Sequence, residues 1–121
     1  MTGGWPPTVL VIEDDLEVLG IIRAHLAGAG YRVLVATGGE TGLELSRSQP
    51  VDLITLDLLM WPVNGQDVLR RLRADPATRD IPVVLVTVVD KHDELTAEGY
   101  VSKPFLARRL LAEVRRLIPL P

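Results

Sequence analysis

Short apolar runs alternate along the chain with stretches in which apolar residues recur at helical spacing. The runs are rich in β-branched residues and have the length of buried strands. They lie at 8–13, 31–36, 51–56, 81–89 and 99–102, and the fourth of them contains the strand VVLVT. Because these strands are apolar on both faces, they predict a parallel sheet that is covered on both sides.

Helices are predicted between and after these strands. The first runs to about Ala27, and either Asp14 or Asp15 can cap its start. Its apolar positions fall on one face and are Leu16, Leu19, Ile22 and Leu26. Further helices are predicted over 40–48, 66–73 and 105–117. Strands and helices that alternate in this way predict a doubly wound α/β sandwich.

One interval between strands is too polar for a full helix. The segment 90–98, with the sequence DKHDELTAE, has only Leu95 and Ala97 as apolar residues. A segment so short and polar forms at most a stunted helix, and a loop is the alternative. We expect one domain over 8–118, with short tails at 1–7 and 119–121.

Composition narrows the possible functions. The 121 residues suit a single core, and the absence of cysteine excludes disulfides and thiolate metal sites. The two histidines, His25 and His92, cannot complete a zinc site and are expected on the surface. A net charge of −3 argues against direct binding of nucleic acid. No apolar run could span a membrane and no signal peptide is recognised, so we expect the cytoplasm.

Polar residues gather where the predicted strands end. Sites in open parallel sheets form at the carboxyl ends of the strands. The residues at those ends are Glu13, Asp14, Asp15, Asp57, Thr87, Ser102 and Lys103. Clustered carboxylates repel one another unless a cation shares the site, and Mg²⁺ is the divalent ion that suits carboxylates and phosphate oxygens. Since a carboxylate can also act as a nucleophile and form an aspartyl-phosphate, the cluster indicates phosphoryl transfer to one of these aspartates.

The motifs at these strand ends resemble those of the receiver domains of bacterial two-component response regulators, the CheY-like family. The matching pieces are VLVIEDD (9–15), ITLDLLM (54–60), Gly65, VVLVT (83–87) and YVSKPF (100–105). The resemblance covers about residues 8 to 118. It implies a flavodoxin-like fold with five parallel strands in the order 2-1-3-4-5 and helices on both faces, here with the fourth helix stunted or absent.

The resemblance also implies a role for each matching residue. Asp57 would be the phosphoacceptor. For Mg²⁺, Asp14 would bind directly, Glu13 mostly through a water, and Leu59 through its backbone carbonyl.

Three further residues would respond to the phosphoryl group. Thr87 would follow it as a switch residue, Lys103 would pair with it, and Tyr100 matches the aromatic switch position of the family. The peptide bond between Lys103 and Pro104 is expected to be cis.

The chain departs from the family pattern at three places. Trp61 stands where the family usually has proline, and it is either a partner contact, a lid over Asp57 or local packing. Val88 stands where a small residue is preferred. The segment from Thr87 to Lys103 is about six residues short, which removes more than one helical turn.

The shortened segment puts the usual output face in doubt. In the family this face includes the fourth helix, the fifth strand and the last helix. A basic surface on the last helix is an alternative, or only a solvated face, and it contains Arg108, Arg109, Arg115 and Arg116.

The leading hypothesis is a phosphoacceptor domain, not an enzyme. A histidine kinase or a histidine phosphotransfer protein would be the donor, and the output would be an unknown partner, a fused domain or a homodimer. The residues two positions after Asp57 and Thr87 are Leu59 and Val89, which cannot orient a water, so we expect slow self-dephosphorylation.

Two other functions remain open. A degenerate receiver would bind a protein without needing phosphate. A phosphatase with an aspartate nucleophile would carry a second acid two residues after it, where this chain has Leu59.

Overall fold

All five predicted strands pair in one parallel sheet in the computed structural model, which describes residues 5–91 and 95–120. The sheet order is β2-β1-β3-β4-β5, as predicted. The strands are β1 (Thr8–Ile12), β2 (Arg32–Ala36), β3 (Leu53–Leu56), β4 (Val83–Thr87) and β5 (Gly99–Ser102). The three central strands are buried along their whole length, which agrees with their continuous apolar character.

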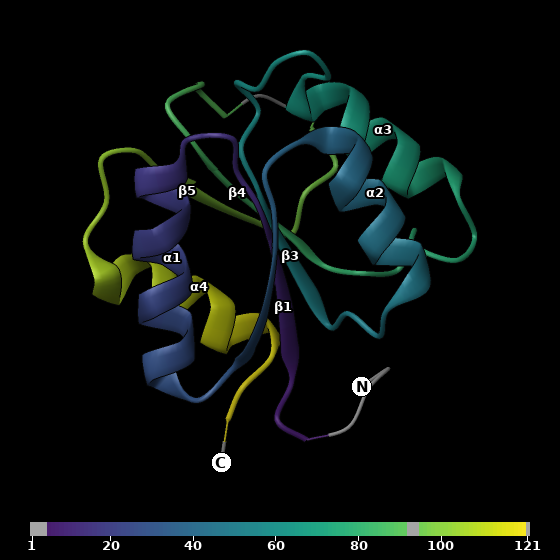
Figure 1. The fold of residues 1–121 in the computed structure, drawn as a ribbon. Coiled ribbons are helices and arrows are strands. Elements are labelled where there is room, and N and C mark those ends of the chain that lie inside the picture. The colour runs from purple at the N-terminus through teal and green to yellow at the C-terminus, as the bar shows by residue number, and fades with distance from the viewer. Residues whose placement is uncertain (1–4, 92–94, 121) are drawn as a thin grey trace.

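Helices cover both faces of the sheet, two on each side (Figure 1). They are α1 (Leu16–Ala29), α2 (Gly39–Ser48), α3 (Gly65–Ala74) and α4 (Ala107–Leu117). The α1 and α4 helices lie on one face, and α2 and α3 lie on the other. Each pair encloses its own apolar cluster against the sheet, so the fold is the predicted flavodoxin-like sandwich.

The first helix ends later than its sequence pattern predicted. Asp15 caps its start, because the Asp15 carboxylate accepts hydrogen bonds from the amides of Glu17 and Val18. The helix continues through Gly28 to Ala29 and stops at Gly30, whose φ of 109° is left-handed. Gly30 therefore ends α1, and Gly28 does not interrupt the helix.

The crossover between β4 and β5 contains no helix in its described residues. Residues 88–91 and 95–98 belong to neither a helix nor a strand, and the described residues form four helices in all. Leu95 and Ala97 pack against the apolar cluster under α2 and α3. Without a helix, residues 95–97 thus cover part of this apolar cluster.

Arg73, near the end of α3, binds the residues that lead into β5. Its Nε and Nη2 atoms donate to the carbonyl of Thr96 at 3.0 and 2.8 Å, and Nη2 also donates to Glu98 Oε1 at 2.6 Å. Its Nη1 atom donates to the carbonyls of Arg79 and Ile81. One half-buried guanidinium thus joins α3 to the chain on both sides of β4.

Candidate functional site

The predicted site residues meet at the carboxyl edge of the sheet, the upper edge in Figure 1. Glu13 and Asp14 follow β1, and Asp57 follows β3. These two strands are neighbours, and their register pairs Ile12 with Leu56, so Glu13 and Asp57 come next to each other. The strand order places Thr87 and Lys103 progressively farther along the same edge.

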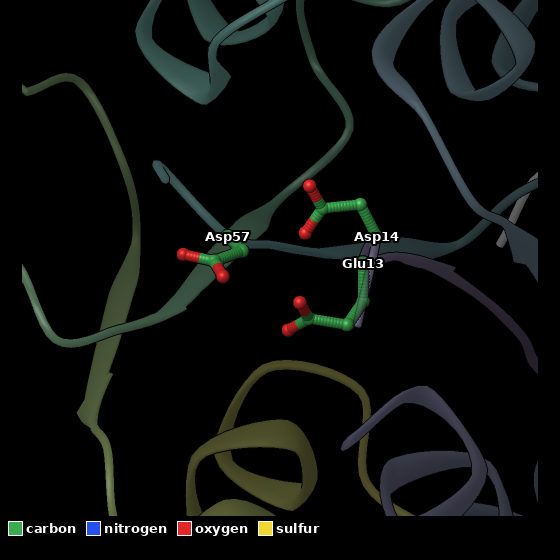
Figure 2. Close-up of side chains that lie close together, drawn as sticks. All are labelled: Glu13, Asp14 and Asp57. Atoms are coloured by element: carbon green, nitrogen blue, oxygen red, sulfur yellow. The ribbon is translucent and has the colours of Figure 1, made fainter. Parts of the chain in front are cut away.

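Three carboxylates converge there (Figure 2). One oxygen from each of Glu13, Asp14 and Asp57 lies within 4.8 Å of the other two. Glu13 and Asp57 are buried, with 1% and 6% of their surface exposed, whereas Asp14 is exposed. Carboxylate oxygens at this spacing, open to solvent on one side, fit a hard divalent cation that keeps some of its waters.

Lys103 bridges the two buried carboxylates. Its Nζ donates to Glu13 Oε1 at 2.7 Å and to Asp57 Oδ2 at 2.8 Å. Burial alone would lower the pKa of Lys103, but these two hydrogen bonds raise it above its ordinary value. Lys103 is therefore a fixed positive charge beside Asp57.

The buried glutamate remains difficult to ionise in spite of this ammonium. Burial, helped by the negative charge of Asp57, raises the pKa of Glu13 to about 7, although the hydrogen bond from Lys103 acts in the opposite direction. Only two of the three carboxylates bond the ammonium of Lys103, so the site has room for further positive charge.

The two predicted switch residues hold the same peptide segment. Thr87 is fully buried, and its Oγ1 accepts a hydrogen bond from the amide of Val89 at 3.3 Å. The hydroxyl of Tyr100 donates to the carbonyl of Val89. A displacement of either side chain would consequently change the position of Val89.

The loop after Asp57 is shaped by contacts that the motif alone does not reveal. The amide of Leu59 donates to Asp57 Oδ1 at 3.0 Å, and the amide of Gly65 donates to the carbonyl of Leu58 at 2.9 Å. A Cβ atom at Gly65 would lie 2.1 Å from the carbonyl oxygen of Asp57. Only glycine fits at this point, so Gly65 sets how closely α3 approaches the acceptor. Its presence among the matching motifs was the only sign of this in the sequence.

The residues that depart from the family pattern are all accessible. Trp61 and Val88 are exposed, and the amide of Trp61 donates to Asp14 Oδ2 at 3.4 Å. His25 is exposed as predicted, while His92 lies outside the described residues. The bond between Lys103 and Pro104 is cis, and so are Trp5–Pro6 and Trp61–Pro62.

Two of the four arginines on α4 are engaged within the domain. Arg109 donates to the carbonyl of Tyr100, and Arg116 donates to that of Glu98. Both also pair with Glu113, whose pKa the Arg116 hydrogen bond holds below its usual value. The remaining two, Arg108 and Arg115, are exposed.

Comparison with known proteins decides the family. Residues 9–115 match the response regulator receiver domain family. The chain belongs to this family. Among the described residues, no helix of this receiver domain has the length and apolar character needed to cross a bilayer.

Curated relatives are DNA-binding or transcriptional regulators. One is the DNA-binding dual master transcriptional regulator RpaA of Synechocystis, 37% identical over 118 residues. Another is the transcriptional regulatory protein CusR of Escherichia coli, 35% identical over 116 residues. The alignments cover 93% and 91% of this chain but 49% and 50% of the relatives. This receiver domain therefore spans about half the length of the curated relatives it matches.

Solved structures with this fold include two receiver domains. The N-terminal domain of a response regulator receiver protein from Methanoculleus marisnigri is 32% identical, with a TM-score of 0.75 and coverage of 94% of this chain and 98% of that one. The receiver domain of a sensor histidine kinase from Pseudomonas aeruginosa is 25% identical, with a TM-score of 0.85 and the same coverage. The second holds a magnesium ion coordinated in its active-site cleft.

Proposed function

We propose that this receiver domain accepts a phosphoryl group on Asp57 and relays the event as a change of conformation. The observation that carries this proposal is the setting of Asp57, a buried carboxylate beside the ammonium of Lys103 and within reach of two further carboxylates. A histidine kinase or a histidine phosphotransfer protein is the proposed donor, as is usual for the family.

Glu13, Asp14 and Asp57 are the proposed magnesium site, with the carbonyl of Leu59 as a further ligand. The three carboxylates fit Mg²⁺ because it favours oxygen ligands and retains several waters. When bound, the ion supplies positive charge that neutralises the oxygens of the transferred group.

The side chains of this domain position the reacting oxygen. Leu59 and Lys103 hold the two carboxylate oxygens of Asp57 through one hydrogen bond each. An Asp57 oxygen attacks phosphorus, the phosphorus–nitrogen bond of the phosphohistidine breaks, and the imidazole nitrogen keeps the electron pair. The ring leaves neutral because its other nitrogen carries a proton. Lys103 then pairs with the new phosphoryl group.

Thr87 and Tyr100 are the proposed route from the phosphoryl group to the surface. The hydroxyl of Thr87 would donate to a phosphoryl oxygen and weaken its present contact with the Val89 amide. Tyr100 donates to the carbonyl of Val89, so both residues influence the conformation of the same peptide segment. A local change of charge would in this way shift the equilibrium between two conformations of this segment.

The proposed output passes through a fused domain. Relatives of about twice the length are named as DNA-binding or transcriptional regulators, which favours output through a fused domain over direct contact of this domain with nucleic acid. A separate partner or a homodimer is the alternative route. We place the domain in the cytoplasm and propose that it is not an enzyme.

A phosphate-independent binding module is the second candidate function. The observations that favour it are the crossover without a described helix and the exposure of Trp61 and Val88. The acidic site opposes it, since a binding module has no need of three clustered carboxylates, two of them bonded to one lysine. An aspartate-nucleophile phosphatase is less well supported, because Leu59 stands where its second acid would be.

Incubation with Mg²⁺ and acetyl phosphate separates these functions. Intact mass should show one added phosphoryl group in the parent chain and in Asp80→Asn, an exposed aspartate that precedes β4 at the opposite edge, and none in Asp57→Asn. No uptake from acetyl phosphate or from a panel of histidine kinases would favour the binding module.

The same samples measure the lifetime of the phosphoryl group. Leu59 and Val89 offer no polar side chain to orient a water, so we expect slow loss after the donor is removed. Loss within seconds would contradict this expectation.

A further inference from the structure

A cavity of about 670 Å³ lies at the amino edge of the sheet, opposite the acidic site. Segments that are far apart in the sequence form its walls where the parallel strands begin, at the lower edge in Figure 1. They are Trp5 ahead of β1, residues 51–52 ahead of β3, residues 76–77 and 80–82 ahead of β4, and residues 117–119 at the end of α4. We call this space the amino-edge cavity. It shares no lining residue with the acidic site, so the proposed phosphoryl transfer gives it no role.

The size and lining of the amino-edge cavity fit a small organic molecule. Ligand pockets in proteins have volumes of about 300 to 1,000 Å³ and are lined mostly by apolar and aromatic side chains. Two of the residues that line this cavity are aspartates, and all the others are apolar. A hollow of this volume holds a small molecule, whereas a folded partner needs a broad surface of about 800 Å².

Trp5 gives the cavity an aromatic wall that the domain itself leaves half uncovered. It lines the cavity and is still 53% exposed. Tryptophan has the aromatic face that attracts a cation most strongly, and its large apolar surface favours stacking with another ring. The indole of Trp5 is therefore available to a ligand that carries a ring, a positive charge or both.

The charge of the lining favours a cation. Asp52 and Asp80 are its only charged residues, and no lysine, arginine or histidine of the described chain lines the cavity. Asp52 is buried and accepts a hydrogen bond from the amide of Thr8 at 2.8 Å, which fixes one carboxylate in the wall. Asp80 is exposed, and its carboxylate makes no hydrogen bond or ion pair with another residue among those the structure describes. A ligand that brings a positive charge can therefore pair with Asp80, while an anion would face two carboxylates.

We propose that the amino-edge cavity binds a small organic cation with an aromatic body, of the chemical class of the arylalkylamines. The ring lies against Trp5 and the apolar wall, and the ammonium pairs with Asp80. This assignment is independent of the proposed function of Asp57, because the two sites lie at opposite edges of the sheet and share no residue.

Three probes with one ring system test the class of ligand. Tryptamine carries an ammonium, tryptophol a hydroxyl and indolepropionate a carboxylate at the end of the same short chain. Two-dimensional amide and indole NMR spectra of the isotope-labelled protein report where each probe binds, because the unlabelled probes give no signal. The protein has two tryptophans, Trp5 and Trp61, so Trp61→Ala assigns the indole signal of Trp5 and also serves as its matched control at the carboxyl edge.

We expect tryptamine to shift the indole signal of Trp5 and the amide signals of Ile81 and Leu117 in a saturable way. Tryptophol should bind about threefold more weakly, as expected for the loss of one exposed ion pair, and indolepropionate more weakly still. Trp5→Ala should weaken the binding of tryptamine by about tenfold or more, and Trp61→Ala should not change it.

The ion pair has its own matched variants. Asp80→Asn should weaken the binding of tryptamine by about threefold and leave that of tryptophol unchanged. Asp90→Asn is the control, because Asp90 is an exposed aspartate that follows β4 at the carboxyl edge. The dispersed amide signals of each variant show that it folds.

Two results would overturn the proposal. Equal affinity for the three probes, or an equal response of Asp80→Asn and Asp90→Asn, would overturn the assignment of a cation. Tryptamine at millimolar concentration that leaves the signals of the cavity residues unmoved, or shifts them without saturation, would overturn the site itself. Neither result concerns uptake of phosphate by Asp57, so the proposed function would stand.

Discussion

At the scale of single residues, the core contains one polar side chain that takes no part in the proposed site. Thr55 is buried in β3, two residues before the acceptor, and its hydroxyl is the only buried side-chain polar atom without a hydrogen-bond partner among the described residues. Its hydroxyl has lost its water without gaining a partner, which destabilises the folded state.

Thr55→Val should therefore raise the free energy of unfolding by about 1 kcal/mol, because it replaces an unsatisfied hydroxyl with a methyl group of similar size. Thr78→Val is the matched control. The Thr78 hydroxyl is equally buried but donates to the carbonyl of Leu72 at 2.8 Å, so its removal should lower that free energy. Urea unfolding of both variants measures the difference, and a loss of stability in Thr55→Val would contradict the prediction.

At the scale of elements, the contact between α3 and the loop after β3 decides the shape of the acceptor site. Gly65 begins α3 where a Cβ atom would meet backbone atoms of Asp57 and Leu58 at 2.1 to 2.8 Å. Backbone atoms cannot move aside as the end of a flexible side chain can. The helix and the loop would have to separate to admit any larger residue.

Gly65→Ala should consequently lower the thermal midpoint and slow uptake of phosphate from acetyl phosphate, because the loop carries both Asp57 and Leu59. Gly20→Ala is the control, since nothing lies within 4 Å of a Cβ at Gly20 inside α1. It should stabilise the domain by up to about 1 kcal/mol through helix propensity and leave uptake unchanged. Normal uptake by Gly65→Ala would show that the loop tolerates the displacement.

Local patterns predicted the elements well because each depends on residues close together in the sequence. The apolar runs located every strand, and the acidic residues at their ends located the cluster of Glu13, Asp14 and Asp57. The sequence placed Lys103 at the same edge of the sheet, but it did not predict which side chains its ammonium bonds. The two bonds of Lys103 to residues 90 and 46 positions away are not visible in any local pattern.

At the scale of the whole molecule, a set of hydrogen bonds holds the crossover whose described residues form no helix. Arg73 on α3 holds Thr96 and Glu98, and the carboxylate of Glu98 also accepts from the amide of Val83 at the start of β4. The carbonyl of Glu98 accepts from Arg116 on α4. Two helices on opposite faces of the sheet are thereby joined around one edge.

Arg73→Met should lower the free energy of unfolding by about 2 kcal/mol or more, because it leaves several carbonyls and the carboxylate of Glu98 without their charged donor. Hydrogen exchange should quicken at the amide of Glu98, which donates to Val83. Arg70→Met is the control, since Arg70 pairs with its helix neighbour Asp67 in an exposed position. Equal stability of the two variants would show that Arg73 is dispensable.

The short crossover has a consequence for how this domain can change over evolutionary time. Thr87 ends β4 and Gly99 begins β5, which leaves eleven residues to connect two neighbouring parallel strands. Such a connection ordinarily takes about a dozen residues or more. A deletion would shorten a path that is already near its minimum, whereas an insertion would only add chain at the surface. An insertion could therefore add helical residues to this connection, but the connection can scarcely be made shorter.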